Sequence, residues 1–313
     1  MKMTKKQKQK LTKLVLSVVV LLVGLLVYRL VDPSGFQERW NEWFGIEEGS
    51  LESVSVADNG NFSVHMIDVG IGDALLVQCD GKNMLIDAAE NDAGDRVLSY
   101  LSSQGVKKLD IAVGTHAHSD HIGGLDTVLS KIPCDRVYLS DMAEEATPTT
   151  KTYLDLLTVI SEKKIPVTKA EAGKSFYLGS AKVEILGPRE LYDDLNETSI
   201  VLKVTYGSTK FLFTGDMESG AEKDLIDAGC DLSADVLKVG HHGSSTSTSK
   251  RFLNAVSPSI ALISVDEDNE YGHPHSEIMK RLQNADVEIY ITRDEGNIVV
   301  VSDGKKIAVR TEK

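Results

Sequence analysis

The chain is poor in cysteine, and its cysteines are not paired. Its 313 residues include only Cys79, Cys134 and Cys230, which stand far apart and without a C-x-x-C spacing. This pattern argues against a disulfide framework and against a cysteine-based zinc site. We therefore expect small, buried hydrophobic side chains at the three positions. A hydrophobic content of 42% is enough for one large core.

Positive charge is scarce after residue 44. Eight Lys/Arg and three Asp/Glu give residues 1–44 a net charge of +5, so the total of −13 leaves −18 for residues 45–313. Such an acidic surface repels a polyanion, because sequence-independent affinity for DNA comes from Lys and Arg that neutralise phosphates. No basic cluster interleaved with aromatic residues is present either. DNA is thus disfavoured as a tightly bound partner.

Long uncharged stretches are confined to the beginning of the chain. Six lysines within residues 1–13 precede an uncharged run over 14–28, which extends with its flanks to roughly the 20 residues that a bilayer requires. No small-x-small cleavage pattern follows, which favours an uncleaved anchor over a cleaved signal peptide. We expect a cytoplasmic basic segment at 1–13 and a transmembrane anchor at 14–31, with the rest of the chain outside the cell.

Aromatic residues gather just after this anchor. Phe36, Trp40, Trp43 and Phe44 follow a helical spacing and include both tryptophans of the chain. The stripe would lie at the lipid headgroups or dock on the following domain, and the spacing leaves both alternatives open. The polar residues up to 60 indicate a linker. We therefore assign 32–60 to a juxtamembrane segment and linker, and 61–313 to one folded domain.

The folded domain alternates strand-like and helix-like segments without internal repeats. Strands are expected at 62–68, 74–78, 84–87, 111–113, 137–139, 182–186, 200–206, 210–214, 236–239, 260–265, 287–291, 298–301 and 306–309. Helices are expected at about 93–103, 121–130, 151–163, 218–228, 249–255 and 275–284. This succession is typical of an α/β (α+β) fold in which helices flank a two-sheet sandwich.

The segment from Thr115 to His121, T-H-A-H-S-D-H, is the most informative in the chain. Alternate side chains of an extended segment share a face, so His116 and His118 can grip one cation. Asp120 and His121, at the turn into the next helix, would point toward a second cation. The spacing predicts a metal site.

The segment T-H-A-H-S-D-H-I-G-G resembles the signature of the metallo-β-lactamase superfamily. That resemblance implies an αββα sandwich with a one- or two-metal hydrolytic centre. The segment D-V-G-I-G-D-A, residues 68–74, resembles the opening of the metallo-β-lactamase domain in the ComEC competence family, with Ile71 in place of a Gln. Asp68 or Asp73 would either reach the cleft or cap the turn.

Later segments extend the resemblance over about residues 62–292. They are N-E-T-S-I-V at 196–201, G-D at 215–216, V-L-K-V-G-H-H-G-S at 236–244 and Y-G-H-P at 271–274. The family implies that Asp216 bridges two divalent ions, Zn or Mn. Because no histidine lies between His121 and Asp216, Asn196 is the expected third ligand of site one, which should be the weaker site.

The resemblance leaves several roles open. Site two would comprise Asp120, His121, Asp216 and one of His241, His242 and His273. Asp120 would help to hold an activated water, and whichever of His241 and His242 is not a ligand would protonate the leaving group. Ser244 and Ser245, with Ser199, are expected to contact a phosphate, unless the serine-rich run is only a polar loop with Ser247 or Thr248 as a helix N-cap. His65, in a strand, is expected to be structural, and His275 is left unassigned.

The function implied by the resemblance is a metal-dependent phosphodiesterase of nuclease type, and the topology expected from residues 1–31 makes it membrane-anchored and extracytoplasmic. A surface hydrolase of a smaller ester (phosphorylcholine-type, nucleotide or lactone) is the alternative. A metal-binding module without catalysis is disfavoured, because Asp120, His121 and Asp216 are all present. The membrane, through the N-terminal helix, and the substrate are the expected partners, and the sequence identifies no protein partner.

Overall fold

The computed structural model describes residues 61–143 and 147–313. The segments expected at 1–13, 14–31 and 32–60, including the aromatic stripe, lie outside the described residues. Within the described ranges, no helix has the length and apolar character needed to cross a membrane.

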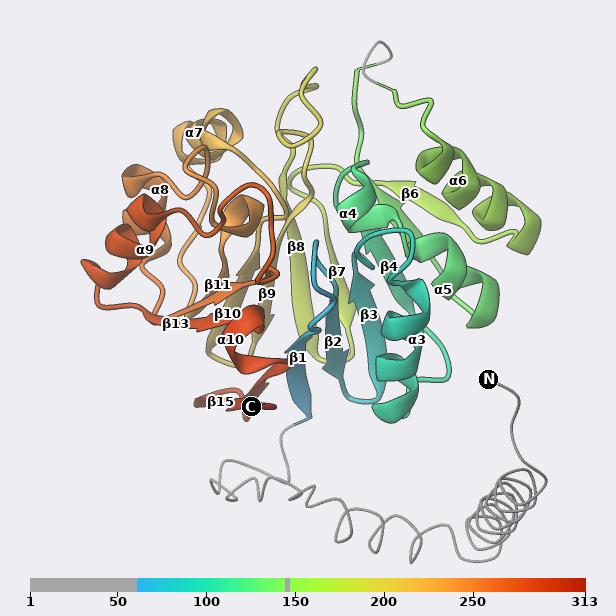
Figure 1. The fold of residues 1–313 in the computed structure, drawn as a ribbon, viewed down its shortest axis with the longest axis horizontal. Coiled ribbons are helices and arrows are strands. Elements are labelled where there is room, and N and C mark those ends of the chain that lie inside the picture. Colours follow the sequence, from blue (N-terminus) through green and yellow to red (C-terminus); the bar gives the residue numbers. More distant parts are fainter. Residues whose placement is uncertain (1–60, 144–146) are drawn as a thin grey trace, which may run out of the picture. The chain divides into compact units, whose positions relative to one another are not determined.

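Two β-sheets face each other (Figure 1). The first sheet contains, in spatial order, β15 (Ile307–Thr311), β14 (Ile298–Ser302), β1 (Phe62–Met66), β2 (Leu75–Cys79), β3 (Lys82–Ile86), β4 (Ile111–Gly114), β5 (Val137–Leu139) and β6 (Val167–Lys169). It is antiparallel from β15 to β3 and parallel from β3 to β6.

The second sheet contains β13 (Glu288–Ile291), β12 (Ile260–Ile263), β11 (Val236–Lys238), β10 (Thr209–Phe213), β9 (Val201–Tyr206), β8 (Ala181–Gly187) and β7 (Ser175–Leu178). Its strands from β10 to β13 are parallel, and the others are antiparallel. Each sheet therefore has a parallel half, whose strands all end at one edge and lead into loops there.

The main core lies between the sheets. Along β8, buried and half-buried residues alternate, as the period of two in a strand requires. Buried side chains of β1, such as Phe62, pack in one cluster with side chains of β10, such as Phe211, whose ring centroid is 4.9 Å away. The facing sides of the two sheets thus form one apolar layer.

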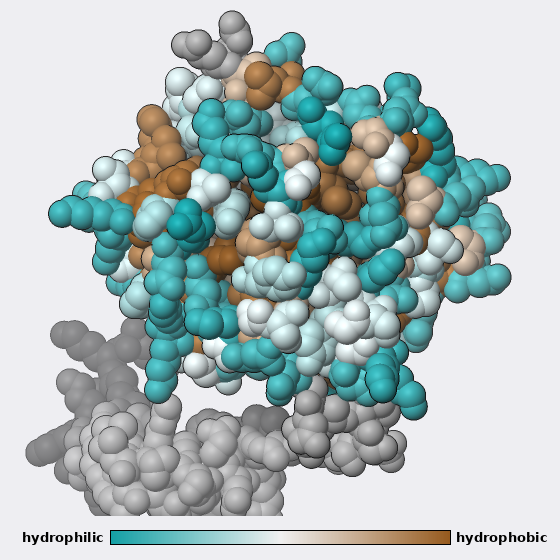
Figure 2. Space-filling model, turned by 180° about the vertical axis from the view of Figure 1, so that it is seen from behind, coloured by the Kyte–Doolittle hydropathy of each residue, from teal (hydrophilic) through white to brown (hydrophobic). Residues whose placement is uncertain are grey.

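Helices cover the outer faces of both sheets, giving four layers in all (Figure 1). On the first sheet lie α3 (Gly94–Ser103), α4 (Ser119–Ile122), α5 (Leu125–Lys131) and α6 (Lys151–Lys163); on the second lie α7 (Ser219–Asp227), α8 (Lys250–Val256) and α9 (Ser276–Gln283). The expected αββα sandwich is confirmed. From behind, hydrophobic side chains appear as small areas between hydrophilic ones (Figure 2), as for a surface exposed to water.

The expected strands and helices are all present, with four differences. The short β6 and β7 and the four-residue α10 (Thr292–Glu295) were not expected. The helix expected at 121–130 is divided into α4 and α5 at Gly123 and Gly124, where a Cβ would lie 2.4 Å from Asn91 N and 2.3 Å from Ala88 O. The N-cap of α8 is Ser249, whose hydroxyl accepts the Phe252 N–H. It is neither Ser247 nor Thr248, the two residues expected there.

Cys79 is buried as expected, while Cys134 and Cys230 are only half-buried.

Candidate metal centre

Loops at the ends of parallel strands bring the expected site residues together. His116, His118, Asp120 and His121 follow β4, and Asp216 follows β10. His242 follows β11 within the 3₁₀ turn η2 (Gly240–Gly243). The two sheets therefore contribute to the site from opposite sides.

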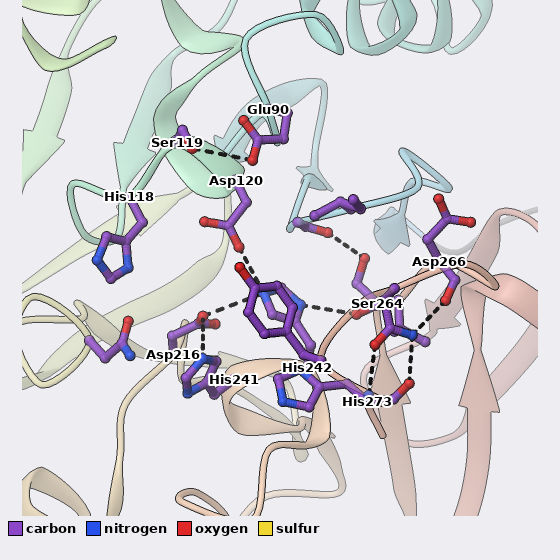
Figure 3. A pocket seen from close by; sticks show the side chains of 16 residues that line it. Glu90, His118, Ser119, Asp120, Asp216, His241, His242, Ser264, Asp266 and His273 are labelled. Carbon is purple, nitrogen blue, oxygen red and sulfur yellow. Dashed lines mark hydrogen bonds and ion pairs between the residues drawn. The ribbon is translucent and has the colours of Figure 1, made fainter. Parts of the chain in front are cut away.

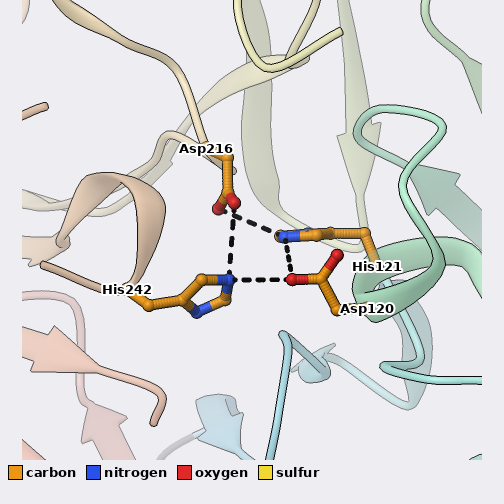
Figure 4. A group of neighbouring side chains, drawn as sticks. All are labelled: Asp120, His121, Asp216 and His242. Atoms are coloured by element: carbon orange, nitrogen blue, oxygen red, sulfur yellow. Dashed lines mark ion pairs between the residues drawn. The ribbon is translucent and has the colours of Figure 1, made fainter. Parts of the chain in front are cut away.

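Four residues form one compact group, which we call the four-residue cluster: Asp120, His121, Asp216 and His242 (Figure 4). His121 Nε2 lies 3.2 Å from Asp216 Oδ1 and 3.8 Å from Asp120 Oδ2. His242 Nε2 lies 3.4 Å from Asp216 Oδ2 and 3.4 Å from Asp120 Oδ2. Two imidazole nitrogens and two carboxylates thus converge on one point.

Buried acceptors fix the orientation of both imidazoles. His121 Nδ1–H donates to Asp87 Oδ2 at 2.8 Å. Asp87 also accepts the backbone N–H of Thr115 at 2.8 Å and its hydroxyl at 2.6 Å. His242 Nδ1–H donates to the carbonyl of Ser264 at 3.0 Å. With the proton held on Nδ1, the Nε2 lone pair of each ring faces the cluster, as in histidines that bind metals.

The electrostatics of the cluster favour positive charge. Burial alone would lower the pKa of His121, but Asp216, Asp120 and Asp87 outweigh burial and raise it well above its usual value. Burial is likewise outweighed at His242, where Asp216 and Asp73 raise the pKa to about 10. The pKa of Asp216 is held well below its usual range, because His121 and His242 overcome the opposite effect of burial. A cation placed here would be strongly stabilised.

Unpaired buried atoms give a test of whether a metal fits. His121 Nε2, His242 Nε2, Asp216 Oδ1 and Asn196 Oδ1 are buried and make no hydrogen bond among the described residues. Buried polar atoms without partners are costly, and a divalent ion would satisfy those of the cluster. Nitrogen and carboxylate oxygen are ligands that suit zinc and manganese. The cluster fits a divalent metal.

His116 and His118 form a second group, which we call the histidine pair. His116 Nε2 lies 3.1 Å from His118 Nδ1, and His116 Nδ1 faces the hydroxyls of Thr115 at 3.2 Å and Ser199 at 3.4 Å. Burial lowers the pKa of His116 well below its usual value, and the neighbouring His121 adds to this effect. Among residues 61–143 and 147–313, no carboxylate joins the pair in a group of three candidate ligands.

The cluster lies at a pocket of about 320 Å³ (Figure 3). Asn196 lines this pocket, and its Nδ2 donates to Glu218 Oε1 at 3.3 Å, which leaves its oxygen free. His118, His241 and His273 line it as well. The pocket therefore contains every histidine expected at the site except the buried His116 and His121.

The three histidines left open by the sequence have different surroundings. His242 belongs to the cluster, whereas His241 Nδ1 faces Glu218 Oε1 at 3.2 Å and its Nε2 lies 3.7 Å from Asp216 Oδ2. Both residues have positive φ, 47° and 51°, which turns consecutive side chains in different directions. Burial, with His242 and His241 nearby, lowers the pKa of His273 to about 4. His273 is outside the cluster.

The three serines expected to contact substrate lie outside the pocket lining. Ser199 is 1% exposed, and its hydroxyl accepts the Asp216 N–H at 3.0 Å. The Ser245 N–H donates to His275 Nδ1 at 2.9 Å, and the Ser244 hydroxyl lies 2.9 Å from that of Thr246. The hydroxyls of Ser199 and Ser244 and the backbone N–H of Ser245 thus contact neighbouring loops, and the expected phosphate contact stays a prediction.

The structure also shows the contacts of His65, His275 and Asp68, which were not among the expected metal ligands. His65 is buried and lies 2.9 Å from both Ser63 Oγ and Tyr100 OH, as a structural histidine would. His275, left open, joins the loops after His242 and Tyr271. Asp68 caps its own turn through the Gly70 N–H.

Sequence reasoning missed three supporting groups. They are Asp87, which holds His121, Glu218, which holds His241, and Lys238, which lies near Asp216. A buried strand that ends in Asp, or a Lys within an otherwise apolar strand, could have pointed to Asp87 and Lys238.

The comparisons with known proteins agree with this fold. The metallo-beta-lactamase superfamily model matches residues 67–266. ComE operon protein 3 of Bacillus subtilis (strain 168) is 29% identical over 260 residues, covering 75% of this chain and 32% of that protein. Competence protein ComA of Neisseria gonorrhoeae is 31% identical over 235 residues, covering 74% and 31%. The chain thus spans about a third of the length of these relatives.

Among solved structures, CmlA, a diiron beta-hydroxylase from Streptomyces venezuelae, is similar with a TM-score of 0.55 at 13% identity. The match covers 78% of this chain and 55% of that chain, and it is a likeness of fold. Together with the family match over residues 67–266, these findings place the chain: it belongs to the metallo-beta-lactamase superfamily.

Proposed function

We propose that this chain is a metal-dependent hydrolase that cleaves phosphodiesters. The observation that supports this most is the convergence of unpaired buried atoms of His121, His242 and Asp216 beside a pocket of about 320 Å³. A phosphodiester substrate is what the resemblance of the D-V-G-I-G-D-A segment to the ComEC family implies, and the similar proteins include one named as a competence protein.

The four-residue cluster would hold one divalent ion, and the histidine pair with Asn196 and Asp216 would hold a second, weaker one. When bound, such ions supply positive charge that polarises a phosphoryl oxygen and activates water. Asp87 and the Ser264 carbonyl keep the proton of His121 and His242 on Nδ1, so that both rings offer Nε2.

His241 is the proposed proton donor to the leaving group. Its Nδ1 is held by Glu218, which also accepts the Thr246 hydroxyl at 3.0 Å, and its Nε2 lies toward the pocket near Asp216 (Figure 3). A protonated imidazole oriented in this way can donate from Nε2. Asp120 faces the same space, with its carboxylate ionised because His121 and His242 outweigh the effect of burial on its pKa.

The test is hydrolysis of bis-p-nitrophenyl phosphate by residues 45–313 with Mn²⁺, Zn²⁺ or Mg²⁺. We expect activity that requires the ion and disappears with chelator. His241→Ala should keep its metal and lose roughly 10²- to 10⁴-fold in rate, whereas His242→Ala should lose metal. Glu218→Gln, which keeps His241 but changes the group that holds its Nδ1, should lose less than His241→Ala. Hydrolysis of a lactone or thioester without any phosphodiesterase activity would contradict the proposal.

A small ester is the second candidate substrate, because the pocket carries little positive charge. The described residues that line it include Glu90, Asp120, Asp216 and Asp266 but no lysine or arginine. A long polyanion would have few compensating cations there. Double-stranded DNA should therefore be cleaved slowly, and added salt should suppress this cleavage strongly. Faster turnover of a small diester than of DNA would favour this candidate.

We also propose that residues 14–31 anchor the chain, with the hydrolase domain outside the cell. The lysines at 1–13 support this orientation. Protease added to intact cells should then digest residues 45–313, and full protection would contradict it.

A further inference from the structure

A fully buried ion pair lies directly beside the four-residue cluster. Lys238 and Asp73 are each 1% exposed, and Lys238 Nζ lies 2.5 Å from Asp73 Oδ2. A buried lysine is costly unless it is paired, so its place here calls for a physical reason. Of the lysines and arginines that the structure describes, Lys238 alone forms an ion pair with a residue of the cluster, at 3.9 Å from Asp216 Oδ1.

The pair joins the two sides of the site. Asp73 precedes β2 of the first sheet, whereas Lys238 ends β11 of the second. Lys238 Nζ also donates to the carbonyl of Gly215 at 3.3 Å, in the loop that carries Asp216. The ligands are divided in the same way, because Asp120 and His121 come from the first sheet and Asp216 and His242 from the second. The pair therefore bridges the two halves of the cluster.

Asp73 also contacts the ligands of both sides. Its backbone N–H donates to the carbonyl of Asp120 at 3.0 Å. Its Oδ1 lies 3.5 Å from His242 Nδ1 and has no hydrogen bond among the described residues. The approach is close enough to require glycine before it, since a Cβ on Gly72 would lie 1.9 Å from the Asp120 carbonyl oxygen.

We propose that Lys238 and Asp73 are positioning residues for metal binding: the buried pair holds the ligands of the two sheets at the separation that a divalent cation needs. The inference rests on the proposed function in one respect, namely that the cluster binds such a cation. It assigns no chemical step to either residue.

The direction in which the metal affinity changes on Lys238→Met separates positioning from simple charge effects. Lys238→Met removes a positive charge close to the cation, so Coulomb interaction alone would make the metal bind more tightly. Loss of positioning would make it bind more weakly. The double variant Lys238→Met/Asp73→Leu leaves the net charge unchanged and removes the buried pair without leaving an unpaired charge, so a weaker affinity there reports geometry.

The experiment is a competition titration of Zn²⁺, and separately of Mn²⁺, between the full-length protein and a chromogenic chelator. We expect the dissociation constant of the double variant to rise by roughly 10- to 100-fold, the range found when groups that orient metal ligands are removed. Lys238→Met should also bind more weakly than the parent protein. Thermal unfolding in EDTA establishes that each variant is folded.

Lys203 provides a matched control. It is 2% exposed, belongs to β9 of the same sheet and pairs with Asp231 at 2.8 Å, a partner outside the cluster. Lys203→Met should lower the unfolding temperature and leave the Zn²⁺ dissociation constant within about twofold, because nothing in its pair touches a ligand.

A folded double variant that binds Zn²⁺ as the parent does would overturn the inference and leave the proposed function intact. A parent protein that binds neither ion would overturn both. If the double variant is unfolded, the direction in which the dissociation constant of Lys238→Met changes decides the question. If Lys238→Met is unfolded as well, Lys238→Gln is measured in its place.

Discussion

The four-residue cluster and the histidine pair are neighbours with different surroundings. The His116 and His121 rings lie 4.1 Å apart. Carboxylates raise the pKa of His121 despite its burial, whereas burial lowers the pKa of His116. Buried histidine nitrogens alone therefore do not make a strong cation site. The carboxylates around them determine how strongly a cation is stabilised. We expect the cluster to bind its ion tightly and the pair to bind weakly.

The largest effect should come from the residue that contacts both imidazoles of the four-residue cluster and that we propose as a ligand of both ions. Asp216 contacts His121 and His242, and its backbone N–H is held by Ser199, which also faces His116. Asp216→Ala should lose metal from both positions and reduce phosphodiester hydrolysis by roughly 10³- to 10⁴-fold, since metal stabilisation of a transition state is worth several kcal/mol. Metal content by mass spectrometry and the hydrolysis rate check this.

Asp231→Ala is the control for Asp216→Ala. It also removes an aspartate that pairs with a buried lysine, Lys203, but this pair lies away from the four-residue cluster. It should retain metal and rate. If Asp216→Ala kept full metal content and activity, the comparison between cluster and pair would have no basis.

A smaller effect on metal content and rate should follow when only the histidine pair is changed. His118→Ala removes one of the two imidazoles of the histidine pair and leaves the contacts of the four-residue cluster in place. The variant should therefore keep about one equivalent of metal. The rate should fall by roughly 10- to 100-fold, the loss typical when support of a metal site is weakened. Metal titration followed by rate measurement distinguishes this variant from Asp216→Ala. Equal loss of both ions in His118→Ala would show that the two positions are not separate.

The sandwich fold could be predicted because periodicity is local. Alternation of polar and apolar residues along 182–186 indicates burial on one face, and the structure has β8 there. The apolar run at 298–301 indicates a buried strand, and the structure has β14 there. β6 was missed because it has three residues with largely exposed side chains. The split between α4 and α5 was missed because it depends on the close approach of other segments to Gly123 and Gly124.

Spacing alone could predict the site only where its residues are contiguous, and Asp216 and the later histidines were expected from the family resemblance. His116 to His121 lie in one segment, so spacing alone placed them near each other. His241 and His242 are neighbours in the chain with the same chemistry, and the positive φ of both residues, together with the positions of Ser264 and Glu218, separates their surroundings. Such contacts across the fold leave no trace in local spacing.

The smallest effect extends the comparison to a buried histidine without carboxylates. Burial lowers the pKa of His65 to about 4 from 6.5, and its neighbours are the hydroxyls of Ser63 and Tyr100. The unfolded chain therefore binds more protons than the folded one between these values. Stability is fully present above pH 6.5 and is lost as the pH falls toward 4.

Between pH 7 and 5.5 this loss should be about 1 kcal/mol in the free energy of unfolding, or roughly 2 °C in the unfolding temperature. His65→Gln, measured in EDTA beside the parent protein, should remove that share of the acid sensitivity, since glutamine does not titrate in this range. The acid response of the cluster is common to both proteins and cancels in the difference. Equal slopes for the two proteins would mean that His65 takes up protons to the same extent in the folded and unfolded states. Burial would then not lower its pKa and would not be what distinguishes it from His121.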